Sequence, residues 1–221
     1  MSSQLFLIFD VDGTLFQADR VTIPAVQETF AAHGLPVPDA KIIATFFGAH
    51  VEDYHAWLVQ QCPLGMLDVI VEQTDKRELE LIAEAGALYP GAIDTLRLLK
   101  ESGCTIATSS NAPQDYFDEV LDHHGLRELV DIPMCRADRF KDKIEMTGYL
   151  LAQCETRPAV VIGDRVDDVR AASAHGIYSV AALYGFGNER EWQGAHARIA
   201  ALAELPEALA QLNGYSRGRR D

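Results

Sequence analysis

Short apolar runs alternate with amphipathic stretches along most of this chain, and that alternation limits the fold more than any other feature of the sequence. Five runs have the length of a strand and are apolar on both faces, as strands inside a covered parallel sheet are. They are Gln4–Phe9, Cys104–Thr108, Val130–Met134, Ala159–Ile162 and Ile177–Ala181. Helical patterns, with apolar residues in steps of three and four, lie between them at Ala92–Ser102, Gln114–His124, Lys143–Gln153 and Asp167–His175. The alternation predicts an α/β fold with a parallel sheet core and helices on both faces.

The interval from Phe16 to Leu88 breaks the alternation, because its pattern is mostly helical. Helices are expected at Pro24–His33, Val51–Gln61 and Leu67–Ala85, and a short extended piece at Ile42–Phe47. We therefore predict a core made of residues 1–15 and 89–221, with residues 16–88 inserted as a mostly α-helical cap subdomain. The insert holds eleven Asp and Glu residues against four Lys and Arg residues, and so carries half of the net charge of −14.

Charge and composition exclude several classes of function. With 19 Lys and Arg against 33 Asp and Glu, the chain repels phosphate backbones, so we expect no nucleic-acid partner. The N-terminal apolar run Leu5–Phe9 is far shorter than the roughly 18 to 20 residues that cross a bilayer, so no membrane partner is expected either. The cysteines at 62, 104, 135 and 154 show no metal-site spacing, which favours reduced thiols and a cytoplasmic protein. The oligomeric state stays open.

Two acidic groups follow predicted strands. Asp10 and Asp12, with Gly13 after them, stand at the end of the first strand, where open parallel sheets form ligand crevices. Asp164 and Asp168 follow the fourth strand. Carboxylates crowd together at a cost unless a cation joins them, and oxygen ligands of this kind suit Mg²⁺. The alternatives are a plain turn at Asp10–Gly13 and acids that complement a helix dipole at 167 and 168.

Hydroxyl groups and lysines complete the candidate site. Ser109, Ser110 and Asn111 follow the second strand and lead into a helix, where they could bind an oxyanion or simply cap the helix. Lys141 and Lys143 open a later helix, where the dipole disfavours a cation, so a bound phosphate would explain one of them. We favour Lys143, because Ile144, Tyr149, Leu150 and Leu151 are expected to anchor its helix to the sheet.

Together these residues resemble the four motifs of the haloacid dehalogenase-like hydrolase superfamily, in the family's order. The matches are DxDGT at Asp10–Thr14, a hydroxyl-ended strand at Ile106–Ser110, a helix-opening lysine at Lys143 or Lys141, and GDxxxD at Gly163, Asp164 and Asp168. Tyr89-Pro90-Gly91 and Tyr184–Gly187 are similar to segments of the phosphoglycolate phosphatase-like subfamily with a helical C1 cap. The resemblance implies a Rossmann-like core. The commoner Gly-Lys-Pro form of the third motif is absent.

The resemblance also implies roles for these residues in a Mg²⁺-dependent phosphatase acting on a small phosphorylated metabolite. Asp10 would attack phosphorus to form an aspartyl-phosphate, and Asp12 would serve as general acid and base. Mg²⁺ would be held by the Asp10 and Asp164 carboxylates and the Asp12 carbonyl, with Asp168 orienting a bound water. The implied phosphate-binding residues are Thr14, Ser110, Asn111 and Lys143. Substrate specificity would come from the insert, where Arg20, His50 and His55 are the candidates.

Other activities of the same fold stay open to different degrees. Asp12 argues against dehalogenation, since dehalogenase members keep no acid at that position. A sugar phosphomutase differs from a phosphatase mainly in how its cap excludes water, so it remains an alternative. A non-catalytic phosphate-binding relative is a second alternative, although both Asp10 and Asp12 are retained. A dinucleotide-binding site is disfavoured, because no GxGxxG sequence follows the first strand.

Overall fold

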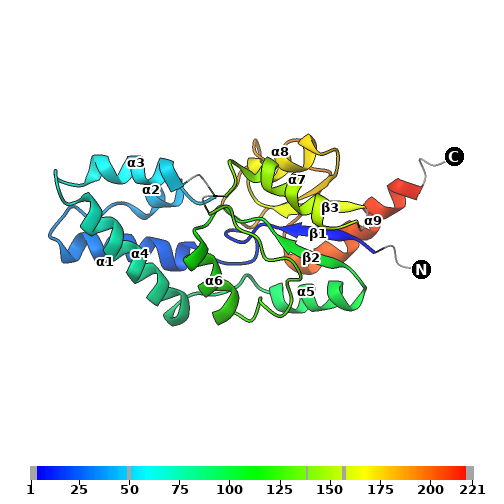
Figure 1. Ribbon diagram of the computed structural model, residues 1–221, viewed down its shortest axis with the longest axis horizontal. Coiled ribbons are helices and arrows are strands. Elements are labelled where there is room, and N and C mark those ends of the chain that lie inside the picture. Colours follow the sequence, from blue (N-terminus) through cyan, green and yellow to red (C-terminus); the bar gives the residue numbers. More distant parts are fainter. Residues whose placement is uncertain (1–3, 49–50, 138, 156–157, 218–221) are drawn as a thin grey trace.

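The computed structural model describes residues 4–48, 51–137, 139–155 and 158–217. Its described strands form a parallel five-stranded sheet in the order β2-β1-β3-β4-β5, which confirms the predicted α/β class. The strands are β1 (Phe6–Phe9), β2 (Thr105–Thr108), β3 (Ala159–Gly163), β4 (Tyr178–Ala182) and β5 (Ala197–Ile199). The core helices are α5 (Ala92–Glu101), α6 (Gln114–His123), α7 (Lys143–Gln153), α8 (Val166–Ala174) and α9 (Leu205–Arg217), with a 3-10 turn at Leu202–Glu204. Figure 1 shows the sheet with both termini at one end of the molecule.

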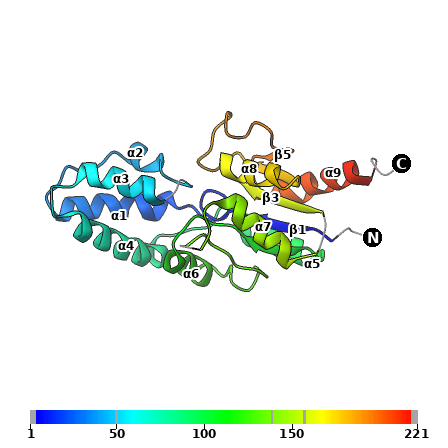
Figure 2. The ribbon, with the colours of Figure 1, turned by 45° about the horizontal axis from the view of Figure 1, so that its top comes forward.

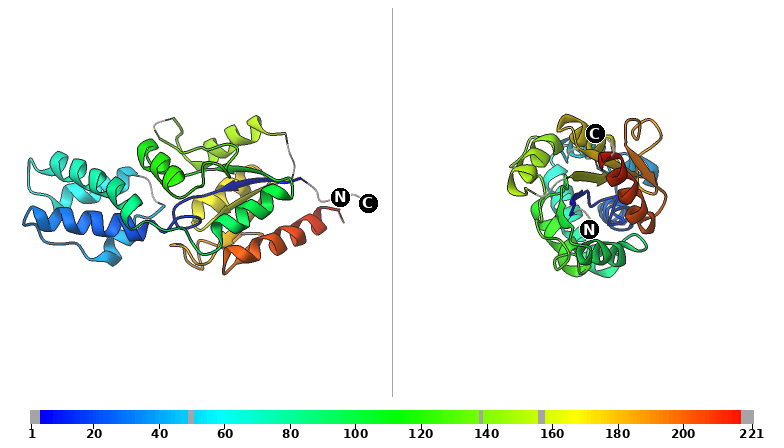
Figure 3. Two further views of the ribbon diagram at one scale, coloured as in Figure 1. Left: turned by 90° about the horizontal axis from the view of Figure 1, so that it is seen from below. Right: turned by 90° about the vertical axis from the view of Figure 1, so that its right-hand side faces the viewer.

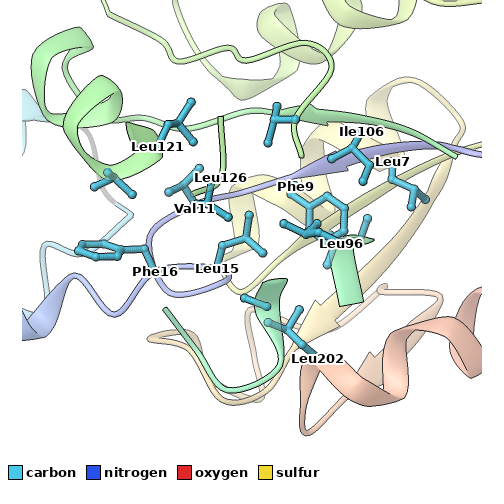
Figure 4. Close-up of a cluster of buried hydrophobic side chains, with 14 of the residues drawn as sticks. Leu7, Phe9, Val11, Leu15, Phe16, Leu96, Ile106, Leu121, Leu126 and Leu202 are labelled. Atoms are coloured by element: carbon cyan, nitrogen blue, oxygen red, sulfur yellow. The ribbon is translucent and has the colours of Figure 1, made fainter. Parts of the chain in front are cut away.

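Alternation along β1 explains why helices cover both faces of the sheet. Leu7 and Phe9 point into a cluster that includes Leu96 of α5, and this cluster is drawn in Figure 4. Phe6 and Ile8 point the other way, into a second cluster that contains Met146 and Leu150 of α7. Figure 3 accordingly shows α5 and α9 on one side of the sheet and α7 on the opposite side. Since all four β1 residues are buried, the strand reads as a continuous apolar run.

Helices α1 (Asp19–Ala32), α2 (Ala40–Ala44), α3 (Val51–Gln61) and α4 (Leu67–Glu84) lie together beyond the sheet (Figures 1 and 2). They enclose a small core of their own, made by Val26, Phe30, Ile43, Leu58 and Ile70. We propose that these helices are the predicted cap. The two connections to the core lie side by side, because Phe16 pairs with Leu88 in an antiparallel bridge and Tyr89 N–H donates to the Leu15 carbonyl.

Several sequence expectations differ from the structure. Val130–Met134 forms no strand; it makes only an isolated bridge between Ala107 and Ile132, because Pro133 lacks the N–H that a ladder needs. Ile42–Phe47 is not extended, because its first residues belong to α2 and the rest form a turn. The short strand β5 is missing from the sequence prediction.

The anchoring of α7 also differs from the expectation. Ile144 and Tyr149 are 38% and 47% exposed, whereas the buried stripe is Lys143, Met146, Thr147 and Leu150. These buried residues follow the helical repeat from Lys143 itself, so they face one side of the helix. No described helix is both long and apolar enough to span a membrane.

Candidate active site

The carboxyl ends of β1, β2 and β3 bring the predicted residues to one edge of the sheet. Because β1 pairs in parallel with both neighbours, Asp10 follows β1 next to Ser109 and Ser110 after β2 and Asp164 after β3. The Asp10 N–H donates to the Ile162 carbonyl over 2.8 Å, which fixes the backbone at the start of the loop. Asp10 is 3% exposed. The strand register therefore places the nucleophile candidate at the mouth of the crevice.

Gly13 allows the loop after β1 to turn tightly. Its φ of 83° lies in the left-handed region that favours glycine. The Gly13 N–H donates to the Phe16 carbonyl at 2.9 Å, and the Leu15 N–H donates to the Val11 carbonyl at 2.8 Å. A Cβ at Gly13 would lie 2.5 Å from Oδ2 of Asp164. The glycine thus serves both the turn and the close approach of the two acidic loops.

Lys143 joins two of the acids. Its Nζ lies 2.6 Å from Oδ1 of Asp10 and 2.7 Å from Oδ1 of Asp168, and all three side chains are buried. Burial lowers the pKa of Lys143, but the two carboxylates outweigh it and raise the pKa above its ordinary value. Lys143 is therefore a fixed cation. Lys141 is exposed, two residues ahead in the loop, and its backbone N–H donates to Glu145.

Asp10, Asp164 and Asp168 form a group that could hold a metal ion. Each offers one oxygen, and these oxygens lie within 4.8 Å of one another. Burial and the neighbouring acids raise the pKa of Asp164 well above its ordinary value, and burial with Asp10 raises the pKa of Asp168 to about 7. Oδ2 of Asp10 has no hydrogen-bond partner among the described residues. Buried hard oxygens that one lysine only partly neutralises fit Mg²⁺.

Asp12 is not a member of that group. Its Oδ1 accepts a 2.9 Å hydrogen bond from the Tyr116 hydroxyl of α6. Burial, followed by the Asp10 charge, raises the pKa of Asp12 to about 7. A carboxyl that titrates near neutral pH can both donate and accept a proton, as a general acid and base must. The Tyr116 hydroxyl thus holds the side chain of Asp12 in the cavity that Asp10 also lines.

The phosphate-binding candidates are placed differently from one another. Asn111 lines the cavity above Asp10 and donates through Nδ2 to the Gly48 carbonyl at 3.1 Å. Ser110 is fully buried, and its Oγ accepts from the Ala112 N–H at 3.1 Å. The Thr14 hydroxyl lies 3.4 Å from Oδ1 of Asp164, so it faces the acidic group. Of the three, Asn111 is among the described residues that line the cavity.

The three residues predicted to set substrate specificity differ in whether they line the cavity. Arg20 is exposed in the first turn of α1 and is not among the described residues that line the cavity. His50 lies outside the described residues. His55 on α3 does line the cavity.

Several residues of the site carry no signal in the sequence. Four helical residues line the cavity: Tyr54, Asp75, Glu78 and Tyr116. The apolar periodicity of their helices does not predict that they do so. Arg165 also joins the two parts of the molecule, since it donates to the Phe47 carbonyl and pairs with Glu191 at 2.7 Å. The DxDGT and GDxxxD motifs could be found because their residues are adjacent in sequence, whereas these contacts arise only from helix packing.

The family model for haloacid dehalogenase-like hydrolases matches residues 7–182. The chain belongs to this family. Its relatives include phosphoglycolate phosphatase 1 of Pseudomonas aeruginosa, 28% identical over 197 residues that cover 83% of this chain and 71% of the relative. The phosphoglycolate phosphatase of Vibrio parahaemolyticus is 24% identical over 218 residues, 92% of this chain and 95% of the relative.

Solved structures agree on the architecture. A predicted phosphoglycolate phosphatase from Haemophilus somnus superposes with a TM-score of 0.83 at 19% identity, over 95% of this chain and 99% of that one. At this identity the likeness establishes the fold. The chain is accordingly a haloacid dehalogenase-like hydrolase with the family's α/β fold.

Proposed function

We propose that this hydrolase is a Mg²⁺-dependent phosphatase that cleaves a small phosphomonoester through an aspartyl-phosphate on Asp10. The observation that carries the proposal is the pairing of two acids with different surroundings in one cavity. Asp10 has an oxygen without a hydrogen-bond partner among the described residues, and Asp12 beside it has a pKa near neutrality. Two carboxyls with separate roles are what nucleophilic and acid-base catalysis require.

In the first step a carboxylate oxygen of Asp10 attacks phosphorus and the bond from phosphorus to the leaving oxygen breaks. Asp12, protonated near neutral pH, gives its proton to that leaving oxygen. Lys143 holds Asp10 in place through the 2.6 Å ion pair and adds positive charge beside the transferring group. An acyl phosphate on Asp10 results.

In the second step Asp12, now a carboxylate, takes a proton from water, and the water oxygen attacks phosphorus. The bond from phosphorus to Asp10 breaks, so phosphate leaves and both carboxyls return to their starting forms. Asp10, Asp164 and Asp168 would hold Mg²⁺, which supplies charge neutralisation for the phosphoryl oxygens when bound. The roles of Asn111 and Ser110 as phosphate ligands belong to the same proposal.

Hydrolysis of p-nitrophenyl phosphate with and without Mg²⁺ tests the proposal directly. We expect release of inorganic phosphate with Mg²⁺ and loss of activity in EDTA, whereas full activity in EDTA would contradict the metal assignment. A phosphomutase would transfer the phosphoryl group to a sugar phosphate instead of releasing it, and a non-catalytic binder would do neither. A cytoplasmic location is part of the proposal, since the spacing of the cysteines favours reduced thiols.

A further inference from the structure

The cavity that contains Asp10 and Asp12 extends toward the proposed cap and is small, with a volume of about 180 Å³. Its described lining comes from the core loops after β1 and β2, from α6, and from α1 to α4 with their connections. Asp10, which is 3% exposed, lines it with an oxygen that has no hydrogen-bond partner among the described residues. If the phosphoryl group sits at Asp10, the remaining space receives the leaving group of the substrate.

Acidic side chains line that space. Asp75 and Glu78 of α4 line it together with Asp12, and the lining residues that the structure describes include no Lys and no Arg. The Thr22 hydroxyl donates to Oε1 of Glu78. Burial, with the charges of Asp75, Asp12 and Asp115, raises the pKa of Glu78 to about 8. The Glu78 carboxyl therefore holds its proton more tightly in the empty cavity than in water, and a bound cation would favour its charged form.

The nearby cations of α4 serve other partners. Arg77 pairs with Glu28 at 2.7 Å, with Glu80 at 3.1 Å and with Glu84 at 3.0 Å. Lys76 is exposed and is not among the described lining residues. His55 lies near Asp75 and lowers its pKa, against the larger upward effect of burial. The charged groups that shift the pKa of Glu78 are, by contrast, all carboxyls, those of Asp75, Asp12 and Asp115.

Aromatic side chains form the rest of the wall. Phe46 and Tyr54 line the cavity and meet edge to face, with ring centroids 5.8 Å apart. The Tyr54 hydroxyl has no hydrogen-bond partner within the described part of the chain. Aromatic faces next to carboxylates attract an ammonium group through both its charge and its position over a ring. The described lining offers no Lys or Arg side chain to a second carboxylate or phosphate.

We propose that this cavity selects phosphomonoesters whose leaving group carries an ammonium, with Glu78 and Asp75 as its counter-ions and the rings of Tyr54 and Phe46 as its apolar wall. The inference rests on the proposed phosphatase function and names the substrate class of that site. The proposed specificity differs from that of the relatives named for phosphoglycolate, a substrate whose leaving group carries a carboxylate.

Three small phosphomonoesters test the inference: O-phosphoethanolamine, ethyl phosphate and 2-phosphoglycolate. Their leaving groups carry an ammonium, no charged group and a carboxylate, respectively. With Mg²⁺ present, we expect kcat/KM to be about tenfold or more higher for O-phosphoethanolamine than for 2-phosphoglycolate, with ethyl phosphate between them. Leaving-group basicity also differs among the three esters, so the ratio must be compared between enzyme variants.

Glu78→Gln removes the negative charge and keeps the size of the side chain. We expect it to lower the ratio of kcat/KM for O-phosphoethanolamine over 2-phosphoglycolate by about fivefold or more, because intrinsic reactivity is the same for both enzymes. Glu72→Gln is the matched control, since Glu72 is an exposed acid of the same helix that does not line the cavity. It should leave the ratio unchanged.

The outcomes separate the two proposals. If p-nitrophenyl phosphate is not hydrolysed by the wild-type protein with Mg²⁺, the phosphatase proposal fails. If it is hydrolysed but 2-phosphoglycolate or ethyl phosphate is the preferred ester, the ammonium inference alone is overturned. The same holds if Glu78→Gln changes the ratio no more than Glu72→Gln does. Circular dichroism of both variants confirms that they are folded before the ratios are compared.

Discussion

The Tyr116 hydroxyl donates a 2.9 Å hydrogen bond to Oδ1 of Asp12, and so ties helix α6 to the loop after β1. Tyr116 is 7% exposed, and its aromatic ring also meets Phe16 edge to face. A donor at this position stabilises the charged form of Asp12 and lowers its pKa against the upward effects of burial and Asp10.

Tyr116→Phe should therefore raise the pKa of Asp12 above about 7. Because Asp12 must be protonated to donate to the leaving oxygen, kcat/KM falls as pH rises through that pKa. We expect the basic limb of the pH profile to move to higher pH in the variant, measured with an alkyl phosphate that needs the acid. A limb that stays in place would mean that another group donates the proton.

Lys143→Ala should lower kcat/KM by about a hundredfold to a thousandfold, as the loss of a preorganised charge at a reacting group does. Lys143 is buried between Asp10 and Asp168, whereas Lys141 is exposed, so Lys141→Ala should stay within a few fold of wild type. Thermal unfolding of both variants checks that the protein is folded. The reverse order of effects would assign the motif to Lys141.

Asp10→Asn should abolish turnover, with less than about a thousandth of the wild-type rate remaining, because the amide cannot replace the nucleophile. Asp12→Asn should still permit slow phosphorylation of Asp10 by p-nitrophenyl phosphate, whose leaving group needs little protonation. A burst of p-nitrophenol from Asp12→Asn, measured in a rapid-mixing instrument, would separate the two steps. Substantial steady turnover by Asp10→Asn would move the nucleophile elsewhere.

Mg²⁺ should raise the melting temperature of the metal-free protein, because Asp10, Asp164 and Asp168 are brought within 4.8 Å of one another only in the folded state. Asp164→Asn removes one charge from this group and should weaken the Mg²⁺ dependence of the melting temperature. Ca²⁺ should bind but inhibit, since its larger and looser coordination sphere misplaces Asp10. An equal response of wild type and Asp164→Asn to Mg²⁺ would argue for a site elsewhere.

We expect the Glu78 carboxyl to make the free energy of unfolding depend on pH. Its pKa rises from 4.5 to about 8 on folding, so the folded chain holds the proton more tightly. The resulting stabilisation is complete below the unfolded pKa and is lost as pH rises through the folded one. Relative to wild type, Glu78→Gln should therefore gain free energy of unfolding between about pH 5 and pH 9, measured by urea denaturation. Glu72→Gln should show no such trend.

Features that depend on local sequence patterns could be predicted from the sequence, whereas contacts between residues far apart in the sequence could not. The strand containing Asp10 and the helix beginning at Lys143 follow from local patterns, and the structure has both. The run at 130–134 looked equally apolar, but Pro133 has no N–H to give to a ladder. The pairing of Lys143 with Asp10 depends on the neighbouring of β1 and β3 in the sheet, two strands that lie far apart in the sequence.

The cavity wall shows the limit more clearly. Asp75 and Glu78 look like surface acids of an ordinary amphipathic helix, and only the packing of α4 beside α1 and α6 makes them part of the cavity lining. Nothing local in the sequence distinguishes them from Glu72 or Glu80. The proposal about substrate charge therefore needed the packing of α1 to α4, whereas the reaction class could be inferred from motifs.

The antiparallel bridge between Phe16 and Leu88 makes the insertion modular. Paired residues in such a bridge have Cα atoms about 5 Å apart, a span that a two-residue turn can close. The helical segment could therefore be excised at this bridge, or exchanged as a cassette with that of a relative, without changing the register of β1. In such chimaeras the leaving-group preference proposed for the cavity would move with the helical segment, while the aspartates of the core would stay in place. Substrate recognition and catalytic chemistry could therefore change independently.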